Sequence, residues 1–148
     1  MERFEEAAKS LKKSMKGIGT DESRLIKEIV NHTNSERQSI KEIYLTMYGK
    51  TLEESIKSEI SGNFLEGVLA LLEPVDKYEA KCLRKSLKAI NTNEKILIQT
   101  ICPKEAFEIE NLKMIYNTTY ERNLEKDIEA ECKGYFGRIL RSLVSCGR

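Results

Sequence analysis

The stretch KSLKKSMKGIGTDE, from Lys9 to Glu22, occurs a second time as KCLRKSLKAINTNE, from Lys81 to Glu94. The two copies align without gaps at an offset of 72 residues, the difference between Gly62 and Gly134, which lie further along in the same register. Roughly a third of the aligned pairs are identical, including charged and glycine positions that a shared helical pattern would not force to coincide. The chain is therefore an internal duplication, and the fold is decided by what one unit of about 72 residues can build.

The composition excludes several classes of protein. The 148 residues carry 25 Lys and Arg against 24 Asp and Glu, and 40% are hydrophobic, which excludes a disordered or collagen-like chain. A net charge of +1 argues against binding nucleic acid, or an anionic membrane, by bulk electrostatics. We therefore expect no nucleic-acid partner, and an anionic partner would need an additional cation. The longest apolar stretch, near Gly67 to Leu72, is far short of the roughly 20 residues of a membrane helix.

Each unit is predicted to form about five short helices, because the apolar positions recur at helical spacing and no alternating strand pattern competes. The fold class is therefore all-α. Capping and helix-ending residues then predict the boundaries in the first unit. These are a first helix ending near Met15, a second capped by Thr20 or Asp21, a third capped by Ser35 with Gln38 and ended by Gly49, a fourth capped by Thr51 with Glu54, and a fifth between Gly62 and Pro74.

The segment Met15 to Thr20 joins the first two helices and holds two glycines one residue apart. Glycines let the backbone curl so that several carbonyl oxygens converge, and Glu59 returns as an acid at the end of the fourth helix. Calcium takes six to eight oxygens, so carbonyls plus one bidentate carboxylate leave positions open for water or a phosphate oxygen. The same residues also fit a plain tight turn, with a glycine helix end and an Asp21 cap. Spacing alone leaves both interpretations open.

The stretch MKGIGTDE, the late Glu59 before Ser61 and Gly62, and the 72-residue period resemble annexin repeats over essentially the whole chain. The resemblance implies that each repeat is a right-handed superhelix of five short helices, with calcium sites in loops on the membrane-facing side. The residues it implies are the carbonyls of Met15, Gly17 and Gly19 with the carboxylate of Glu59 as the main calcium site, the Thr20 carbonyl and Glu22 carboxylate as a weaker neighbouring site, and Ile18 as the apolar residue presented to the bilayer.

The second unit departs from this pattern, because Ala89 and Asn91 replace the two glycines while Glu131 matches Glu59. Asn tolerates a left-handed conformation better than most residues, but Ala does not. We therefore expect repeat 1, residues 1–75, to carry the intact calcium loop and repeat 2, residues 76–148, to carry a degraded one. Calcium binding at Glu131 is expected to be at most weak.

The resemblance implies calcium-dependent binding to acidic phospholipid membranes. A site of mainly neutral carbonyls should bind calcium weakly in solution, on the order of 0.1 to 1 mM. A lipid phosphate would complete the coordination, so calcium and lipid would raise each other's affinity. The charged N-terminus, MERFEEAAKSLKK, lacks the apolar segment of a secretory signal. We expect a cytoplasmic protein that is peripheral on membranes when Ca²⁺ is present.

No catalytic signature stands out, and we expect a protein that is not an enzyme. His32 is the only histidine and lies in a polar stretch, so the sequence gives no basis for a catalytic triad or a histidine-rich metal site. We expect His32 to be a solvated connector residue. The cysteines show no C-x-x-C spacing, so we expect reduced thiols that mostly act as small core hydrophobes. They are Cys82, Cys102, Cys132 and Cys146.

An alternative function is a calcium-insensitive helical scaffold that self-associates or docks on cytoskeletal or other proteins, with the loop glycines kept only for geometry. Annexin cores usually carry four repeats, so two repeats would leave bare a face that is normally covered. We therefore expect a homodimer, or association with further annexin repeats.

Overall fold

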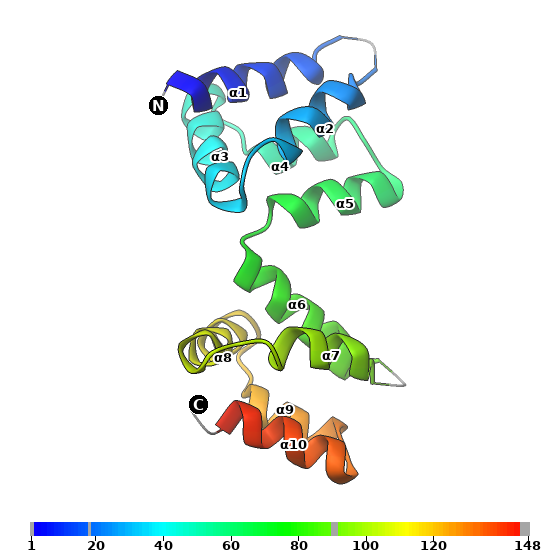
Figure 1. Ribbon diagram of the computed structural model, residues 1–148. Coiled ribbons are helices and arrows are strands. Elements are labelled where there is room, and N and C mark those ends of the chain that lie inside the picture. The colour runs from blue at the N-terminus through cyan, green and yellow to red at the C-terminus, as the bar shows by residue number, and fades with distance from the viewer. Residues whose placement is uncertain (1, 18, 90–91, 146–148) are drawn as a thin grey trace. The chain divides into compact units, whose positions relative to one another are not determined.

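The computed structural model describes residues 2–17, 19–89 and 92–145, which form ten α-helices and no strand (Figure 1). Contacts divide the chain into two compact units, residues 1–74 and 75–148. Unit 1 contains α1 (Glu2–Ser14), α2 (Glu22–Val30), α3 (Asn34–Tyr48), α4 (Leu52–Lys57) and α5 (Gly62–Leu72). Unit 2 contains α6 (Val75–Lys88), α7 (Glu94–Ile101), α8 (Ala106–Tyr120), α9 (Leu124–Glu131) and α10 (Gly134–Ser145). The prediction of an all-helical chain with five helices per repeat is confirmed.

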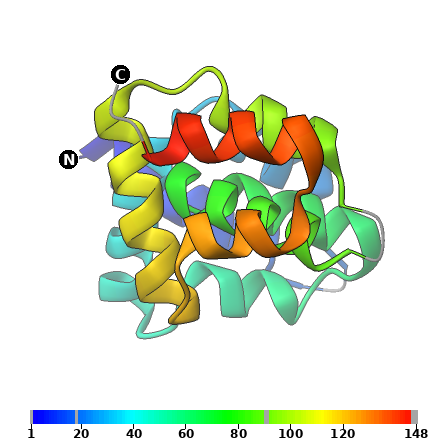
Figure 2. The same ribbon diagram turned by 90° about the horizontal axis from the view of Figure 1, so that it is seen from below.

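In each unit one long helix lies across the ends of the others. In unit 1 this helix is α3, and α1, α2, α4 and α5 run alongside one another (Figure 1). Figure 2 shows α8 in the same position against α9 and α10 of unit 2. As a result, the α1–α2 and α4–α5 connections lie together at the end of unit 1 away from α3, and the α6–α7 and α9–α10 connections do the same in unit 2.

The local sequence explains where several of these helices begin and end. Asp21 caps α2 by accepting a hydrogen bond from the Arg24 amide at 3.0 Å. Thr51 and Glu54 form the expected capping box at the start of α4. Gly49 ends α3 in the left-handed conformation, φ 64°, which glycine adopts without strain.

The predicted start of the third helix is wrong by two residues. Thr33, not Ser35, caps α3, and its hydroxyl accepts from the Glu36 amide while the Glu36 carboxylate accepts from the Thr33 amide at 2.7 Å. The Gln38 side chain instead donates to the Leu72 carbonyl at 3.0 Å. Thr33 and Ser35 are each followed three residues on by an acidic or amide side chain, so the sequence pattern fits both positions.

The two cores repeat the same pattern of apolar residues, which are provided by all five helices of each unit. In unit 1 the fully buried large side chains are Leu25, Ile29, Tyr44, Leu52, Ile56 and Leu72. In unit 2 they include Leu83, Leu97, Leu112, Tyr116, Ile128 and Leu140. The two tyrosines occupy equivalent positions, so each core is built around one buried phenol ring.

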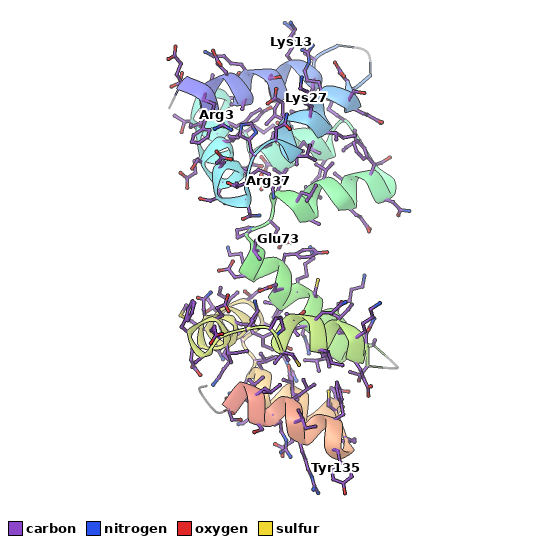
Figure 3. All side chains as sticks on the ribbon, viewed as in Figure 1. Arg3, Lys13, Lys27, Arg37, Glu73 and Tyr135 are labelled. Carbon is purple, nitrogen blue, oxygen red and sulfur yellow. The ribbon has the colours of Figure 1, made fainter. Side chains whose placement is uncertain are left out.

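His32 is buried, not solvated as the sequence predicted. Its Nδ1 donates to the Glu28 carbonyl at 2.7 Å, and its ring lies edge-on to Phe4 with centroids 6.3 Å apart. The His32 carbonyl accepts from Arg37, which Figure 3 labels on α3, at 2.5 Å. The residues next to His32 in the sequence are polar, so the sequence did not indicate that Phe4 of α1 packs against its ring.

The expectation that most cysteines lie in the core holds for one of the three that the structure describes. Cys132 is buried, whereas Cys82 and Cys102 are half-buried, and none of the three is in a disulfide. Cys146 lies outside the described residues. Within those residues, no helix is both long and apolar enough to cross a membrane.

Candidate functional site

The predicted calcium loop lies in the α1–α2 connection of unit 1. Gly17 has φ 114° and Gly19 has φ 83°, and a Cβ at either position would meet no neighbouring atom within 4 Å. The surrounding space would therefore admit a side chain, and it is the backbone conformation that requires glycine at both positions.

The hydrogen bonds of this loop leave the predicted ligand oxygens unused. The Lys16 amide donates to the Lys13 carbonyl at 3.2 Å, and the Asp21 amide donates to the Ser14 carbonyl at 2.8 Å. Among the described residues no backbone hydrogen bond uses the carbonyls of Met15, Gly17 or Gly19. Carbonyls that accept no hydrogen bond within the chain remain available as ligands, so this loop offers three oxygens to a cation.

Glu59 lies in the turn after α4, where its amide donates to the Ile56 carbonyl at 3.0 Å. This turn is at the same end of unit 1 as the α1–α2 loop (Figures 1 and 2). The side chain is exposed, and its carboxylate makes no ion pair or hydrogen bond with another described residue. The fold thus brings an unpaired carboxylate to the end of the unit that carries the loop carbonyls.

The predicted weaker site has a different arrangement. The Thr20 carbonyl already accepts from the Glu22 amide at 3.0 Å, and the exposed Glu22 begins α2. The Thr20 hydroxyl oxygen is buried and has no hydrogen-bond partner among the described residues. Ile18, the predicted lipid contact, lies outside the described residues.

The donor set fits a hard cation. No group of three or more His, Cys, Asp or Glu side chains comes together within the described part of the chain, so a metal at this loop would be held mainly by carbonyl oxygens. Calcium accepts such neutral oxygen ligands with one carboxylate, whereas zinc prefers imidazole and thiolate groups.

Unit 2 keeps the hydrogen-bonded frame of the loop, but its described residues do not reproduce the conformation of Gly17. The Asn93 amide donates to the Ser86 carbonyl at 3.4 Å, and the Glu94 amide to the Thr92 carbonyl at 3.0 Å, matching the bonds of unit 1. Ala89 is not among the described residues with positive φ, so it does not reproduce Gly17. Asn91 lies outside the described residues.

Glu131, the counterpart of Glu59, is the last residue of α9 and is exposed. Burial, and then the negative charges of Glu94 and Glu131, raise the pKa of the neighbouring Cys132 thiol. Carboxylates from the start of α7 and the end of α9 therefore act on the same side chain. Unit 2 has acids at its loop end, but its sequence lacks the two loop glycines.

Sequence reasoning missed an apolar groove between α2 and α5 of unit 1, with a volume of about 390 Å³. Its walls include Ile26, Val30 and Leu71, which are 43%, 58% and 43% exposed. The signal was present in the sequence, because α2 has apolar residues at adjacent positions, more than one buried helix face can accommodate. An apolar surface of this kind is a candidate protein-contact face.

Sequence reasoning also missed a buried ionic cluster in unit 2. Asp127 accepts hydrogen bonds from the Tyr116 hydroxyl at 2.7 Å, from Arg122 Nη2 at 2.6 Å and from Arg84 Nη1 at 3.3 Å. The hydrogen bonds from Arg122 are the main reason that the pKa of Asp127 lies below its usual value, against the opposing effect of burial. Burial first, and then Asp127, raise the pKa of Tyr116. This cluster lies within the helical packing and has a structural role.

Comparison with known proteins identifies the two repeats. The family model described as annexin matches residues 6–71 and again residues 78–143. The chain belongs to the annexin family. Calcium-dependent phospholipid binding is characteristic of annexins, and the two matched segments fall in units 1 and 2.

The similarity to individual annexins extends along nearly the whole chain. The chain is 42% identical over 141 residues to annexin A13 of Canis lupus familiaris, and the match covers 95% of this chain and 45% of that protein. The chicken annexin V structure matches with a TM-score of 0.86 at 35% identity, over 95% of this chain and 45% of that one. The calcium-bound structure of annexin (Sm)1 matches with a TM-score of 0.88 at 30% identity, over 96% and 43%. The chain thus spans about half the length of the annexins it matches.

Proposed function

We propose that this chain binds calcium mainly through repeat 1, residues 1–75, and thereby attaches to acidic phospholipid surfaces. The observation that supports the proposal most directly is the set of three loop carbonyls, at Met15, Gly17 and Gly19, that no described backbone group uses. Glu59 would supply the carboxylate, and Thr20 with Glu22 a weaker neighbouring site. Ile18, at the tip of the loop in the sequence, would contact the lipid.

Charge counting explains why lipid would be part of the site. A calcium ion held by neutral carbonyls and one carboxylate keeps net positive charge and open coordination positions. A phospholipid phosphate would fill one of them, so calcium and lipid binding would be positively coupled. Because the chain has a net charge of only +1, calcium would provide the positive charge that an anionic surface requires.

In this proposal repeat 2, residues 76–148, contributes little calcium binding, because Ala89 replaces the glycine that adopts φ 114° in repeat 1. Glu131 would then be an exposed acid without a carbonyl partner set. We propose that the protein is not an enzyme, resides in the cytoplasm and becomes peripheral on membranes when calcium rises.

Cosedimentation with vesicles that contain phosphatidylserine tests the proposal. The parent chain is expected to pellet with calcium and to be released by a chelator, whereas Glu59→Gln should need at least tenfold more calcium because a neutral amide is a poor calcium ligand. Glu66→Gln is the matched control, since Glu66 is an exposed acid on α5 of the same unit. Equal calcium requirements for Glu59→Gln and the parent would contradict the assignment.

The apolar groove between α2 and α5 supports a second candidate function, self-association through unit 1. Ile26, Val30 and Leu71 are exposed on this surface, and the matched annexins have about as much further chain again as this chain contains. We propose that a second copy of the chain covers the groove, with further annexin repeats on another chain as the alternative occupant.

Sedimentation velocity of the isolated chain at several concentrations tests this second function. The parent should form a dimer, and Val30→Asp should shift it to monomer because burying an unpaired carboxylate is costly. Leu45→Asp is the control, since Leu45 is exposed on α3 and outside the groove. A monomeric parent at every concentration would rule out the homodimer.

A further inference from the structure

A second feature of unit 1 is a polar hollow of about 520 Å³ beside the loop, between the end of α1 and the start of α2. Figure 3 shows Lys13 projecting from α1 near this end. The described residues that line the hollow are Lys13, Ser14, Lys16, Gly19, Thr20, Asp21 and Arg24. Three of them are cationic and one, Asp21, is anionic, so the lining has a net charge of about +2.

The arginine of this hollow is available to a ligand. Arg24 pairs with Asp21 at 3.5 Å, but the two side chains are 37% and 51% exposed, and ion pairs this exposed contribute little. A phosphate offers a guanidinium a shorter, bidentate, charge-assisted contact. Because the Arg24 amide, not its side chain, makes the helix cap with Asp21, the guanidinium can leave without uncapping α2.

Two further groups in the hollow favour an anion. Thr20 lines the hollow, its hydroxyl has no hydrogen-bond partner among the described residues, and a hydroxyl can donate to a phosphate oxygen. The nine-residue helix α2 begins beside it, at Glu22, with the positive end of its dipole directed to this side. The cationic lining, the unpartnered hydroxyl and the helix end therefore act in the same direction.

Unit 2 provides an internal comparison. Lys85 and Lys88 stand at the positions of Lys13 and Lys16, but Ile96 stands at the position of Arg24. The guanidinium is therefore a property of the first repeat alone, in the same unit that carries the glycine loop.

We propose that this hollow binds a phosphomonoester dianion, with Arg24 as the bidentate partner and Lys13 and Lys16 as supporting charges. A phosphomonoester carries close to two negative charges at neutral pH, which matches the charge of the lining, whereas a phosphodiester carries one. The group can belong to a soluble phosphomonoester or to a lipid with a terminal phosphate. The lipid case rests on the proposed function, because it needs the loop to face a membrane.

The first experiment needs neither calcium nor a membrane. Glycerol 3-phosphate is titrated into the ¹⁵N-labelled full chain in the presence of a chelator. Saturable NMR shifts are expected at Gly19, Thr20 and Arg24, with none of comparable size at Thr92 and Asn93. Arg24→Gln should weaken binding roughly three- to tenfold, while Lys27→Gln, an equal charge change on α2 outside the hollow, should leave it unchanged.

Shifts of equal size in both units, or equal weakening by Arg24→Gln and Lys27→Gln, would overturn the proposal, because binding would then follow net charge alone. The absence of any glycerol 3-phosphate-induced shift at Gly19, Thr20 and Arg24 would also overturn the proposal.

The second experiment distinguishes the lipid from the soluble source. Vesicles containing phosphatidate are compared with vesicles containing phosphatidylserine, at matched surface charge and saturating calcium. The parent should bind the phosphatidate vesicles more tightly, and Arg24→Gln should lose that preference while keeping its calcium-dependent binding to phosphatidylserine. A preference that survives Arg24→Gln would overturn the lipid assignment. If no vesicle binding depends on calcium while the NMR shifts persist, the proposed function fails and the phosphate site stands.

Discussion

Units 1 and 2 have the same five-helix arrangement but differ at two places, the loop between their first two helices and the surroundings of their core tyrosine. Unit 1 has the two glycines with positive φ, and the buried hydroxyl of Tyr44 has no hydrogen-bond partner in the described part of the chain. Unit 2 lacks those glycines, and the Tyr116 hydroxyl donates to Asp127. The helical packing therefore tolerates change at both places, and a loop suited to calcium is not required for the fold.

The different surroundings of Tyr44 and Tyr116 coincide with three positions at which the two repeats have different residues. Ser55, Lys12 and Lys50 in unit 1 correspond to Asp127, Arg84 and Arg122 in unit 2. Ser55 cannot provide the carboxylate that Asp127 provides in unit 2, and Lys12 instead lies over the Tyr48 ring. Unit 2 thus gains a buried ionic cluster at the position where unit 1 has a serine whose hydroxyl donates to the Thr51 carbonyl.

The largest effect is expected from removing the charge of Asp127. Its side chain is 6% exposed, and Asp127→Asn removes the anion that Arg84 and Arg122 share. Because Arg122 is half-exposed and stays solvated, the free energy of unfolding should fall by about 2 kcal/mol. At the matched position of unit 1, Ser55→Ala should cost less than about 1 kcal/mol. Guanidinium denaturation followed by circular dichroism measures both, and equal costs would remove the distinction between the units.

The cost of Asp127→Asn should also depend on pH. The pKa of Asp127 is lowered in the folded chain from its ordinary value of 3.8, so its stabilising effect is complete above that value and is lost as pH falls through the folded pKa. The stability difference between parent and Asp127→Asn should therefore be constant near neutrality and shrink in strong acid. A difference that stays constant down to pH 2 would mean that the charge of Asp127 is not the cause.

A loop exchange sharpens the comparison at the calcium site. Gly17→Ala forces φ 114° on a residue with a side chain, a strain of about 1–3 kcal/mol, and should weaken calcium binding at least tenfold by calorimetry. Gly67→Ala is the control, because Gly67 lies within α5 and does not have positive φ. The reverse double change, Ala89→Gly with Asn91→Gly, should add calcium binding in unit 2. Unchanged affinity in Gly17→Ala would argue for the plain-turn interpretation of the loop.

The smallest effects distinguish the two buried tyrosines. Tyr116→Phe removes a hydrogen bond to a buried carboxylate and should cost about 1–2 kcal/mol of unfolding free energy. Tyr44→Phe removes a hydroxyl that no other described residue hydrogen-bonds, and it should be neutral within about 0.5 kcal/mol, or slightly stabilising. A larger cost for Tyr44→Phe than for Tyr116→Phe would reverse the comparison.

Much of the fold was predictable because the duplication doubled the evidence for each helix. The glycine ends, the Thr51–Glu54 box and the apolar stripes recur or are locally unambiguous, so the all-helical class and five helices per repeat followed. The start of α3 and the burial of His32 were not predictable. Two overlapping capping patterns compete at α3, and the apolar partner of His32 is Phe4, distant in sequence.

The candidate site was partly predictable. The spacing of Gly17 and Gly19 indicated a loop that needs left-handed residues, and both have positive φ. The polar hollow was not predicted, because Arg24 lies on α2, whereas Lys13 lies on α1 and Lys16 lies in the connection between the two helices. In the sequence alone Arg24 looks like an ordinary exposed charge. Asp127 was missed for a related reason, since its arginines become neighbours only when α6 and the α8–α9 connection fold against α9.

A crystal structure grown with calcium tests the central claim, that the first repeat and not the second carries the calcium site. We expect an ion bound by the carbonyls of Met15, Gly17 and Gly19 and by the carboxylate of Glu59, with none of matching occupancy at Glu131. An ion at Glu131 without one at Glu59, or no ion in either loop at saturating calcium, would contradict it.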